Sequence, residues 1–183
     1  MVSVNVAQLL LSPLGTTRDF DFREGLPDPD GDLHLRGPVS GHAHLIRTSD
    51  GILVHTDHRA PVTLECSRCL DEVKGIVEGT LDEEFLPTTD VHTGVPVAFE
   101  GEDDQPRINE HHEIDLDEVL RQDILTNLPL HPLCDTACPG LCETCGQRLD
   151  QAHTPHETEP PVDESSPFAR LAVLLSNSDT EER

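Results

Sequence analysis

Six cysteines are the residues of this sequence with the clearest potential for chemistry. Two form the pair Cys66-Ser67-Arg68-Cys69, and the other four lie in the run Cys-Asp-Thr-Ala-Cys-Pro-Gly-Leu-Cys-Glu-Thr-Cys-Gly at 134–146. A Cys-x-x-Cys turn lets two thiolates converge on one ion, and two such turns from distant parts of a chain are a strong pattern for structural zinc. Gly146 follows Cys145, and glycine permits the backbone to fold back toward sulfur without a clashing Cβ. The spacing therefore predicts a zinc site.

The ligand set stays open, because six thiols exceed the four that a closed structural zinc site needs. The preferred set joins the two Cys-x-x-Cys turns and consists of Cys66, Cys69, Cys142 and Cys145. A local alternative, with a three-residue spacer less typical of a knuckle, consists of Cys134, Cys138, Cys142 and Cys145. A second site is conceivable from Cys134, Cys138, His153 and His156. Without metal, buried cysteines would pack as small hydrophobic side chains.

Catalytic and redox roles find little support in the residue pattern. A redox Cys142–Cys145 pair would need its first thiol at a helix N-terminus, whereas Gly146 places this pair in a loop. A catalytic zinc needs an open coordination position, and four available thiolates favour a closed one. His111 and His112 are adjacent, so in an extended strand they would point to opposite faces. The sequence contains no Ser-His-Asp, P-loop or GxGxxG arrangement, and we expect a protein that is not an enzyme.

Composition and charge limit the fold and the partners. Of 183 residues, 35% are hydrophobic and 3% aromatic, which is thin for a large close-packed core. A metal clamp helps here because metal binding adds directly to folding free energy. The net charge of −24 repels phosphate backbones and favours either simple solubility or a surface made for a basic partner.

We expect a cytoplasmic protein. Residues 2–11 alternate apolar and polar side chains rather than forming the apolar block of a signal peptide. No apolar run approaches membrane-spanning length. In the cytoplasm thiols stay reduced, so the cysteine pairs favour metal over disulfides.

Period-two patterns predict an antiparallel β-meander in the first half of the chain. We expect strands at 1–11, 39–45, 52–54, 62–66 and 73–81, with a hairpin turn at 49–51. The first cysteine pair then sits at the tip of a hairpin. Residues 12–31 are rich in proline, glycine and acids and are predicted to be a loop. The side chains of Phe20 and Phe22 could pack this loop against the rest of the protein at two points.

The second half is predicted to contain one covering helix. Asp115 and Glu118 have the spacing of a capping box, apolar side chains follow at helical spacing, and Pro129 stops the run. Residues 87–105 are predicted to be a flexible acidic loop and 167–175 a short helix. We therefore expect an α+β fold: a curved antiparallel sheet or partly open barrel with one covering helix, a zinc-knuckle-like cysteine lobe and a short C-terminal helix. The predicted division is a β-rich body at 1–130, the lobe at 131–150, and an acidic linker, helix and tail at 151–183.

Five short motifs together resemble the YceD family, the large ribosomal RNA subunit accumulation proteins. They are Val-Thr-Leu-Glu-Cys-Ser-Arg-Cys-Leu at 62–70, Glu-Ile-Asp-Leu at 113–116, Leu-Pro-Leu-His-Pro-Leu-Cys at 128–134, Gly-Leu-Cys-Glu-Thr-Cys-Gly at 140–146 and Pro-Phe-Ala-Arg-Leu at 167–171. The resemblance implies a non-enzymatic bacterial or plastid factor needed for 23S ribosomal RNA to accumulate, hence for assembly of the 50S subunit.

The resemblance and the charge lead to two hypotheses about partners. The first is a factor that contacts a basic ribosomal protein or the pre-50S particle. The second is a zinc-containing module that binds ribosomal RNA directly, as small zinc modules and open antiparallel barrels often do. The net charge and the scarcity of aromatic side chains for base stacking count against the second. We expect no membrane partner and no small-molecule substrate.

Overall fold

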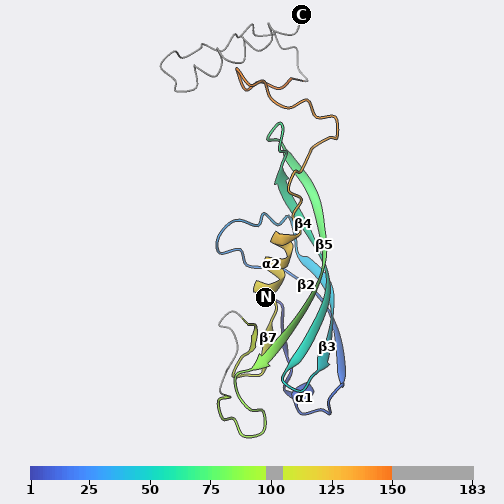
Figure 1. Cartoon of the computed structure of the whole chain (residues 1–183), viewed down its shortest axis with the longest axis vertical. Helices are drawn as coiled ribbons and strands as arrows, with labels where there is room; N and C mark the ends of the chain where they lie inside the picture. The colour runs from blue at the N-terminus through green and yellow to red at the C-terminus, as the bar shows by residue number, and fades with distance from the viewer. Residues whose placement is uncertain (98–104, 150–183) are drawn as a thin grey trace, which may run out of the picture. The chain divides into compact units, whose positions relative to one another are not determined.

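The computed structural model describes residues 1–97 and 105–149, and the chain divides into two compact units, Met1–Cys138 and Pro139–Arg183. All helices and strands that we describe belong to the first unit (Figure 1). In chain order they are β1 (Ser3–Asn5), α1 (Ala7–Leu10), β2 (Thr17–Glu24), β3 (Val39–Arg47), β4 (Ile52–Glu65), β5 (Glu72–Pro87), β6 (Arg107–Ile108), β7 (Glu113–Asp115) and α2 (Asp117–Thr126).

An open five-stranded sheet forms most of the first unit. Its strand order is β2-β3-β4-β5-β6, antiparallel from β2 to β5, with the short β6 parallel to β5. Strands β1 and β7 form a separate two-stranded sheet. The fold is therefore mostly sheet with few helices, as the alternating patterns predict.

The predicted meander is confirmed for its central strands. The segments at 52–54 and 62–66 belong to a single long strand, β4, which pairs with β5 from Ile52↔Phe85 to Glu65↔Glu72. Because β4 ends at Glu65 and β5 begins at Glu72, the Cys66–Cys69 turn lies at the tip of this hairpin. The predicted placement of the first cysteine pair is confirmed.

The prediction of a loop over residues 12–31 was wrong for its central part. Residues 17–24 form β2, which pairs with β3 from Thr17↔Ile46 to Glu24↔Val39. Phe20 and Phe22 alternate with Asp19 and Asp21, and this period-two signal was obscured by the flanking prolines and glycines.

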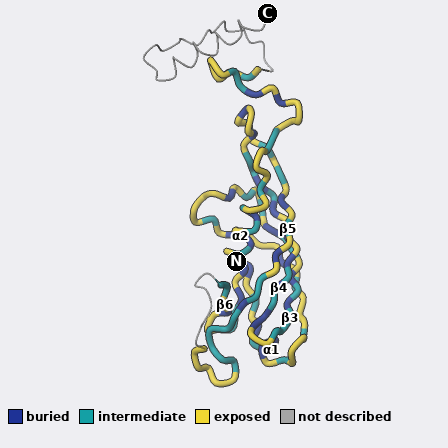
Figure 2. Tube along the Cα trace, viewed as in Figure 1, coloured by how far each residue is buried: buried dark blue, intermediate teal, exposed yellow. Residues whose placement is uncertain are grey.

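The core lies on one face of the sheet. Every second residue of β4 from Ile52 to Val62 is buried, as expected when a strand has one face packed and one in solvent. Helix α2 lies beside β5 (Figure 2), and its side chains Leu120 and Ile124 are fully buried. Among the described residues, the side chains on the opposite face of β2–β5 are partly or fully exposed.

Helix α2 is confirmed, although its N-terminus differs from the predicted capping box. Leu116, not Asp115, occupies the N-cap position, and no side chain caps it there. The Asp115 carboxylate still accepts a hydrogen bond from the Asp117 N–H at 2.9 Å. Asp117 is itself buried and accepts a hydrogen bond from the Val2 N–H at 2.6 Å, which ties the start of the chain to the helix.

The prediction of one strand over the first eleven residues was only partly right, because Ser3–Asn5 form β1 whereas Ala7–Leu10 form the short helix α1. Two further predictions concern segments that the structure describes in part. Residues 88–97 form a turn in which Asp90 accepts hydrogen bonds from the Thr93 and Gly94 N–H groups. The rest of the predicted acidic loop, at 98–104, and the predicted helix at 167–175 lie outside the described residues. Within the described ranges, no helix is long and apolar enough to cross a membrane.

Candidate metal centre

Four cysteines gather at the tip of the β4–β5 hairpin. The Sγ atoms of Cys66, Cys69, Cys134 and Cys138 all lie within 4.8 Å of one another. Cys66, Cys69 and Cys138 are buried and Cys134 is exposed. All four belong to the first unit, Met1–Cys138. The cluster therefore joins the hairpin tip to the segment that follows α2.

The sulfur separations fit a tetrahedral metal site. Cys69 Sγ lies 3.5 Å from Cys134 Sγ, and Cys66 Sγ lies 3.9 Å from Cys138 Sγ. A tetrahedron of Zn–S bonds of about 2.3 Å places neighbouring sulfurs about 3.8 Å apart. A disulfide would need a separation of about 2.05 Å. The donor set is thus suited to a four-coordinate ion such as zinc.

Hydrogen bonds from one backbone donor and one side-chain donor hold the two contributing segments together beside the sulfurs. In the hairpin tip, the Leu70 N–H donates to Cys66 O and the Cys66 N–H donates to Asp71 O, closing a tight turn. The Ser67 N–H then donates to Pro132 O at 2.8 Å, and Arg68 Nη1 donates to Cys138 O at 2.8 Å. These bonds fix the arrangement in which two cysteines come from each segment.

The electrostatics of the cluster also favour a bound cation. Backbone N–H groups, first that of Arg68 and then that of Cys134, lower the pKa of the Cys66 thiol to about 6. The hydrogen bond with the neighbouring Cys69 sulfur raises the pKa of Cys134 to about 12. Four thiolates this close repel one another, so full ionisation needs a compensating positive charge.

The structure brings together a combination of cysteines that the sequence prediction did not contain as a set. Cys66 and Cys69, from the preferred set, meet Cys134 and Cys138, from the alternatives. Cys142 and Cys145 belong to the second unit, so their place in the preferred set stays a prediction. His153 and His156 lie outside the described residues. The order of elements along the chain is the signal that could have indicated the observed set, because Cys134 closely follows the helix that packs beside β5.

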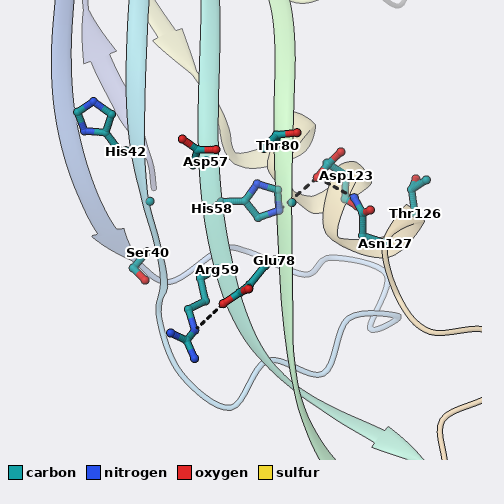
Figure 3. A pocket seen from close by; sticks show the side chains of 12 residues that line it. Ser40, His42, Asp57, His58, Arg59, Glu78, Thr80, Asp123, Thr126 and Asn127 are labelled. Carbon is teal, nitrogen blue, oxygen red and sulfur yellow. Dashed lines mark hydrogen bonds and ion pairs between the residues drawn. The ribbon is translucent and has the colours of Figure 1, made fainter.

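A groove between the sheet and α2 contains a buried histidine. The groove has a volume of about 870 Å³, and the imidazole of His58 points from β4 toward Asp123 on α2 (Figure 3). Nε2 of His58 lies 3.2 Å from Oδ2 of Asp123, and the His58 side chain has 0% exposure. Burial lowers the pKa of His58. Neither ring nitrogen of His58 has a hydrogen-bond partner among the described residues, so its contact with Asp123 is a close approach of the two groups.

Two cross-strand rows of histidine and aspartate lie on the open face of the sheet. One row pairs Asp19, His44, His55 and Asp82, and the other pairs Asp21, His42, Asp57 and Thr80. We call these eight residues the outer-face cluster. It contains four carboxylates and no lysine or arginine.

Carboxylate–imidazole hydrogen bonds connect the strands across the outer-face cluster. Nδ1 of His42 lies 2.8 Å from Asp21 Oδ1, and Nδ1 of His55 lies 2.6 Å from Asp82 Oδ1. These bonds raise the pKa values of His42 and His55. The corresponding bond from His44 lowers the pKa of Asp19.

The chain thus has a mostly β fold with a cysteine cluster at the tip of a hairpin, and this cluster is a candidate structural metal centre. Residues 54–175 match the YceD family, described as "Large ribosomal RNA subunit accumulation protein YceD", and the chain belongs to this family. The resemblance noted from the sequence motifs is confirmed.

Curated relatives are found in mycobacteria. The chain is 35% identical over 136 residues to uncharacterized proteins of Mycobacterium bovis and Mycobacterium tuberculosis, covering 72% of this chain and 60% of theirs. It is 32% identical over 141 residues to an uncharacterized protein of Mycobacterium leprae, covering 76% of this chain and 60% of that protein. The chain thus spans about 60% of the length of these relatives. No solved structure matches the chain.

Proposed function

We propose that this protein is a non-enzymatic factor that supports the accumulation of 23S ribosomal RNA and the assembly of the 50S subunit. Membership of the YceD family is the observation that carries this proposal, because the family is described by that role. The protein acts through contacts with a basic ribosomal protein or with the pre-50S particle.

We further propose that zinc binds the cysteine cluster as a structural ion. The Sγ atoms of Cys66, Cys69, Cys134 and Cys138 would saturate its coordination, and a saturated zinc supplies folding free energy rather than a catalytic position. The ion would fix the segment after α2 to the hairpin tip.

The outer-face cluster is the surface best suited to a basic partner. Asp21 and Asp82 have 88% and 67% side-chain exposure, and the net charge of the whole chain is −24. Complementary charge steers a cationic segment to such a surface and sets the salt dependence of binding. The same charge opposes direct contact with a phosphate backbone.

The test is recovery of ribosomal components from cells with the tagged full chain at low and at high salt. The proposal predicts that basic ribosomal proteins or pre-50S particles are recovered at low salt and released at high salt. Recovery of no ribosomal component at low salt would overturn it. Recovery that disappears after nuclease treatment would instead favour direct binding of RNA.

A matched pair of variants tests the surface. One variant neutralises the four aspartates of the outer-face cluster, as Asp19→Asn, Asp21→Asn, Asp57→Asn and Asp82→Asn. The control neutralises four exposed acids elsewhere, as Glu24→Gln, Asp50→Asn, Glu72→Gln and Glu110→Gln. Since both change the net charge equally, a loss of recovery confined to the first variant locates the docking surface. An equal loss in both would mean that only the overall charge matters.

A further inference from the structure

Strand β2 forms one edge of the five-stranded sheet (Figure 1). Within the described part of the chain, β3 is the only strand that pairs with it. The Arg47 N–H donates to Thr16 O at 2.9 Å, and hydrogen-bonded and non-bonded pairs alternate along an antiparallel ladder. The backbone groups of Asp19, Asp21 and Arg23 therefore point away from β3, toward the free edge. Such an edge is a template for another strand.

The side chains of β2 complement a second copy of the same strand. Its sequence is Thr-Arg-Asp-Phe-Asp-Phe-Arg-Glu. In an antiparallel pair of two such strands, a two-fold axis through Asp21 places Asp19 of one copy opposite Arg23 of the other. It also places Arg18 opposite Glu24. Each of these pairs occurs twice, because both copies present the same surface, and opposite charges directly across two strands stabilise their pairing.

The remaining side chains of the strand favour this register. The axis through Asp21 places Phe20, which is partly buried, opposite the buried Phe22 of the other copy, and aromatic pairs across two strands add stability. An axis through Phe20 would instead place Asp19 opposite Asp21, and like charges directly opposite destabilise a pair of strands. In the favoured register only Asp21 faces its own copy. Its Oδ1 lies 2.8 Å from Nδ1 of His42, whose protonated form offsets part of that repulsion.

We propose that two copies of this chain pair antiparallel through the free edges of β2, with the two-fold axis at Asp21. The occupant of the edge is a second copy because the order of charges along the strand complements itself. The two sheets form one continuous sheet in this dimer. Since Asp19 and Asp21 belong to the outer-face cluster, the clusters of both copies lie on the same face and meet at the axis. The proposal is independent of the ribosomal role.

Sedimentation of the full chain under reducing conditions, at rising protein concentration, tests the dimer. The wild type should change from one copy to two as the concentration approaches millimolar, and one copy at every concentration would overturn the proposal. Arg23→Asp should raise the dissociation constant of the dimer about tenfold or more, because symmetry turns two attractive pairs into repulsive ones. Arg59→Asp is the control, since it makes the same charge change on β4 at a side chain with 58% exposure. Equal weakening in both variants would also overturn the proposal, because only the overall charge would then matter.

Two further variants test the register and the use of the backbone edge. Asp19→Arg plus Arg23→Asp exchanges the two charges and keeps the net charge, so it should restore the dimer that Arg23→Asp weakens. A folded exchange variant that stays a single copy would overturn the assigned register. Asp21→Pro removes an N–H that faces the free edge, which edge strands tolerate, so this variant should fold and remain a single copy. Dimers of Asp21→Pro as stable as those of the wild type would overturn the proposal.

Discussion

Nε2 of His58 lies 3.2 Å from Oδ2 of Asp123, and this contact joins the central strand β4 to helix α2. The same carboxylate oxygen accepts a hydrogen bond from Asn127 Nδ2 at the end of the helix. Residues 127–133 connect the end of α2 to Cys134. The contact therefore positions the helix from which the second half of the cysteine cluster follows.

The buried imidazole should make folding stability depend on pH. Burial lowers the pKa of His58 below its ordinary value of 6.5, so the unfolded chain takes up a proton at a higher pH than the folded chain. Stability from this site is lost as the pH falls below about 6.5. The variant His58→Gln should flatten that part of the curve of unfolding free energy against pH, measured with urea. The exposed His111→Gln is the control, and a curve changed equally by both would contradict this account.

Gly79 should be intolerant of a methyl group because it lies opposite His58 in the sheet. A Cβ at Gly79 would lie 2.6 Å from Asp123 Oδ2 and 2.7 Å from His58 Cε1. Gly79→Ala should therefore lower the free energy of unfolding by about 1–3 kcal/mol, the usual cost of overpacking. On the same strand, a Cβ at Gly75 would come no closer than 3.4 Å to Val62, so Gly75→Ala is the matched control. Equal urea midpoints for the two variants would show that the space beside His58 is not restricted.

Asp117 should anchor the start of the chain to the helix. Its buried carboxylate accepts the hydrogen bond from the Val2 N–H, and removing one partner of a buried bond costs about 1–3 kcal/mol. Asp117→Ala should lower the free energy of unfolding by this amount and speed amide exchange in β1. Glu118→Ala, at a neighbouring side chain with 60% exposure, should cost far less. Unchanged exchange in β1 would count against the anchor.

Binding of a basic partner to the outer-face cluster should weaken as the pH falls. Hydrogen bonds to Asp21 and Asp82 raise the pKa values of His42 and His55. Protonation of these imidazoles therefore begins at a higher pH than for an ordinary histidine. The positive charge that they gain offsets the negative charge of the neighbouring carboxylates. Recovery of the partner should drop as the pH falls, beginning above the ordinary imidazole pKa of 6.5, and His42→Gln plus His55→Gln should reduce that drop. An unaltered drop in the double variant would place the titrating groups elsewhere.

Local patterns predicted most of the sheet, because alternation along β4 and β5 is visible residue by residue. They also placed Cys66 and Cys69 at a hairpin tip, since the turn lies between two alternating runs. The pattern around β2 predicts a loop because the alternating Phe20 and Phe22 stand among turn-forming residues. The partners of the first cysteine pair could not be derived from spacing, because that choice depends on where the chain goes after α2. The hydrogen bond from the Ser67 N–H to Pro132 O, a tertiary contact with no sequence signature, fixes that path.

We propose that one metal ion joins the hairpin tip to the segment after α2 through Cys66, Cys69, Cys134 and Cys138. The most direct measurement is the zinc content and melting temperature of the double variant Cys134→Ser plus Cys138→Ser beside the wild type. We predict the loss of one ion per chain and a lower melting temperature, since the bound ion contributes to folding. Wild-type zinc content with an unchanged melting temperature would contradict the claim.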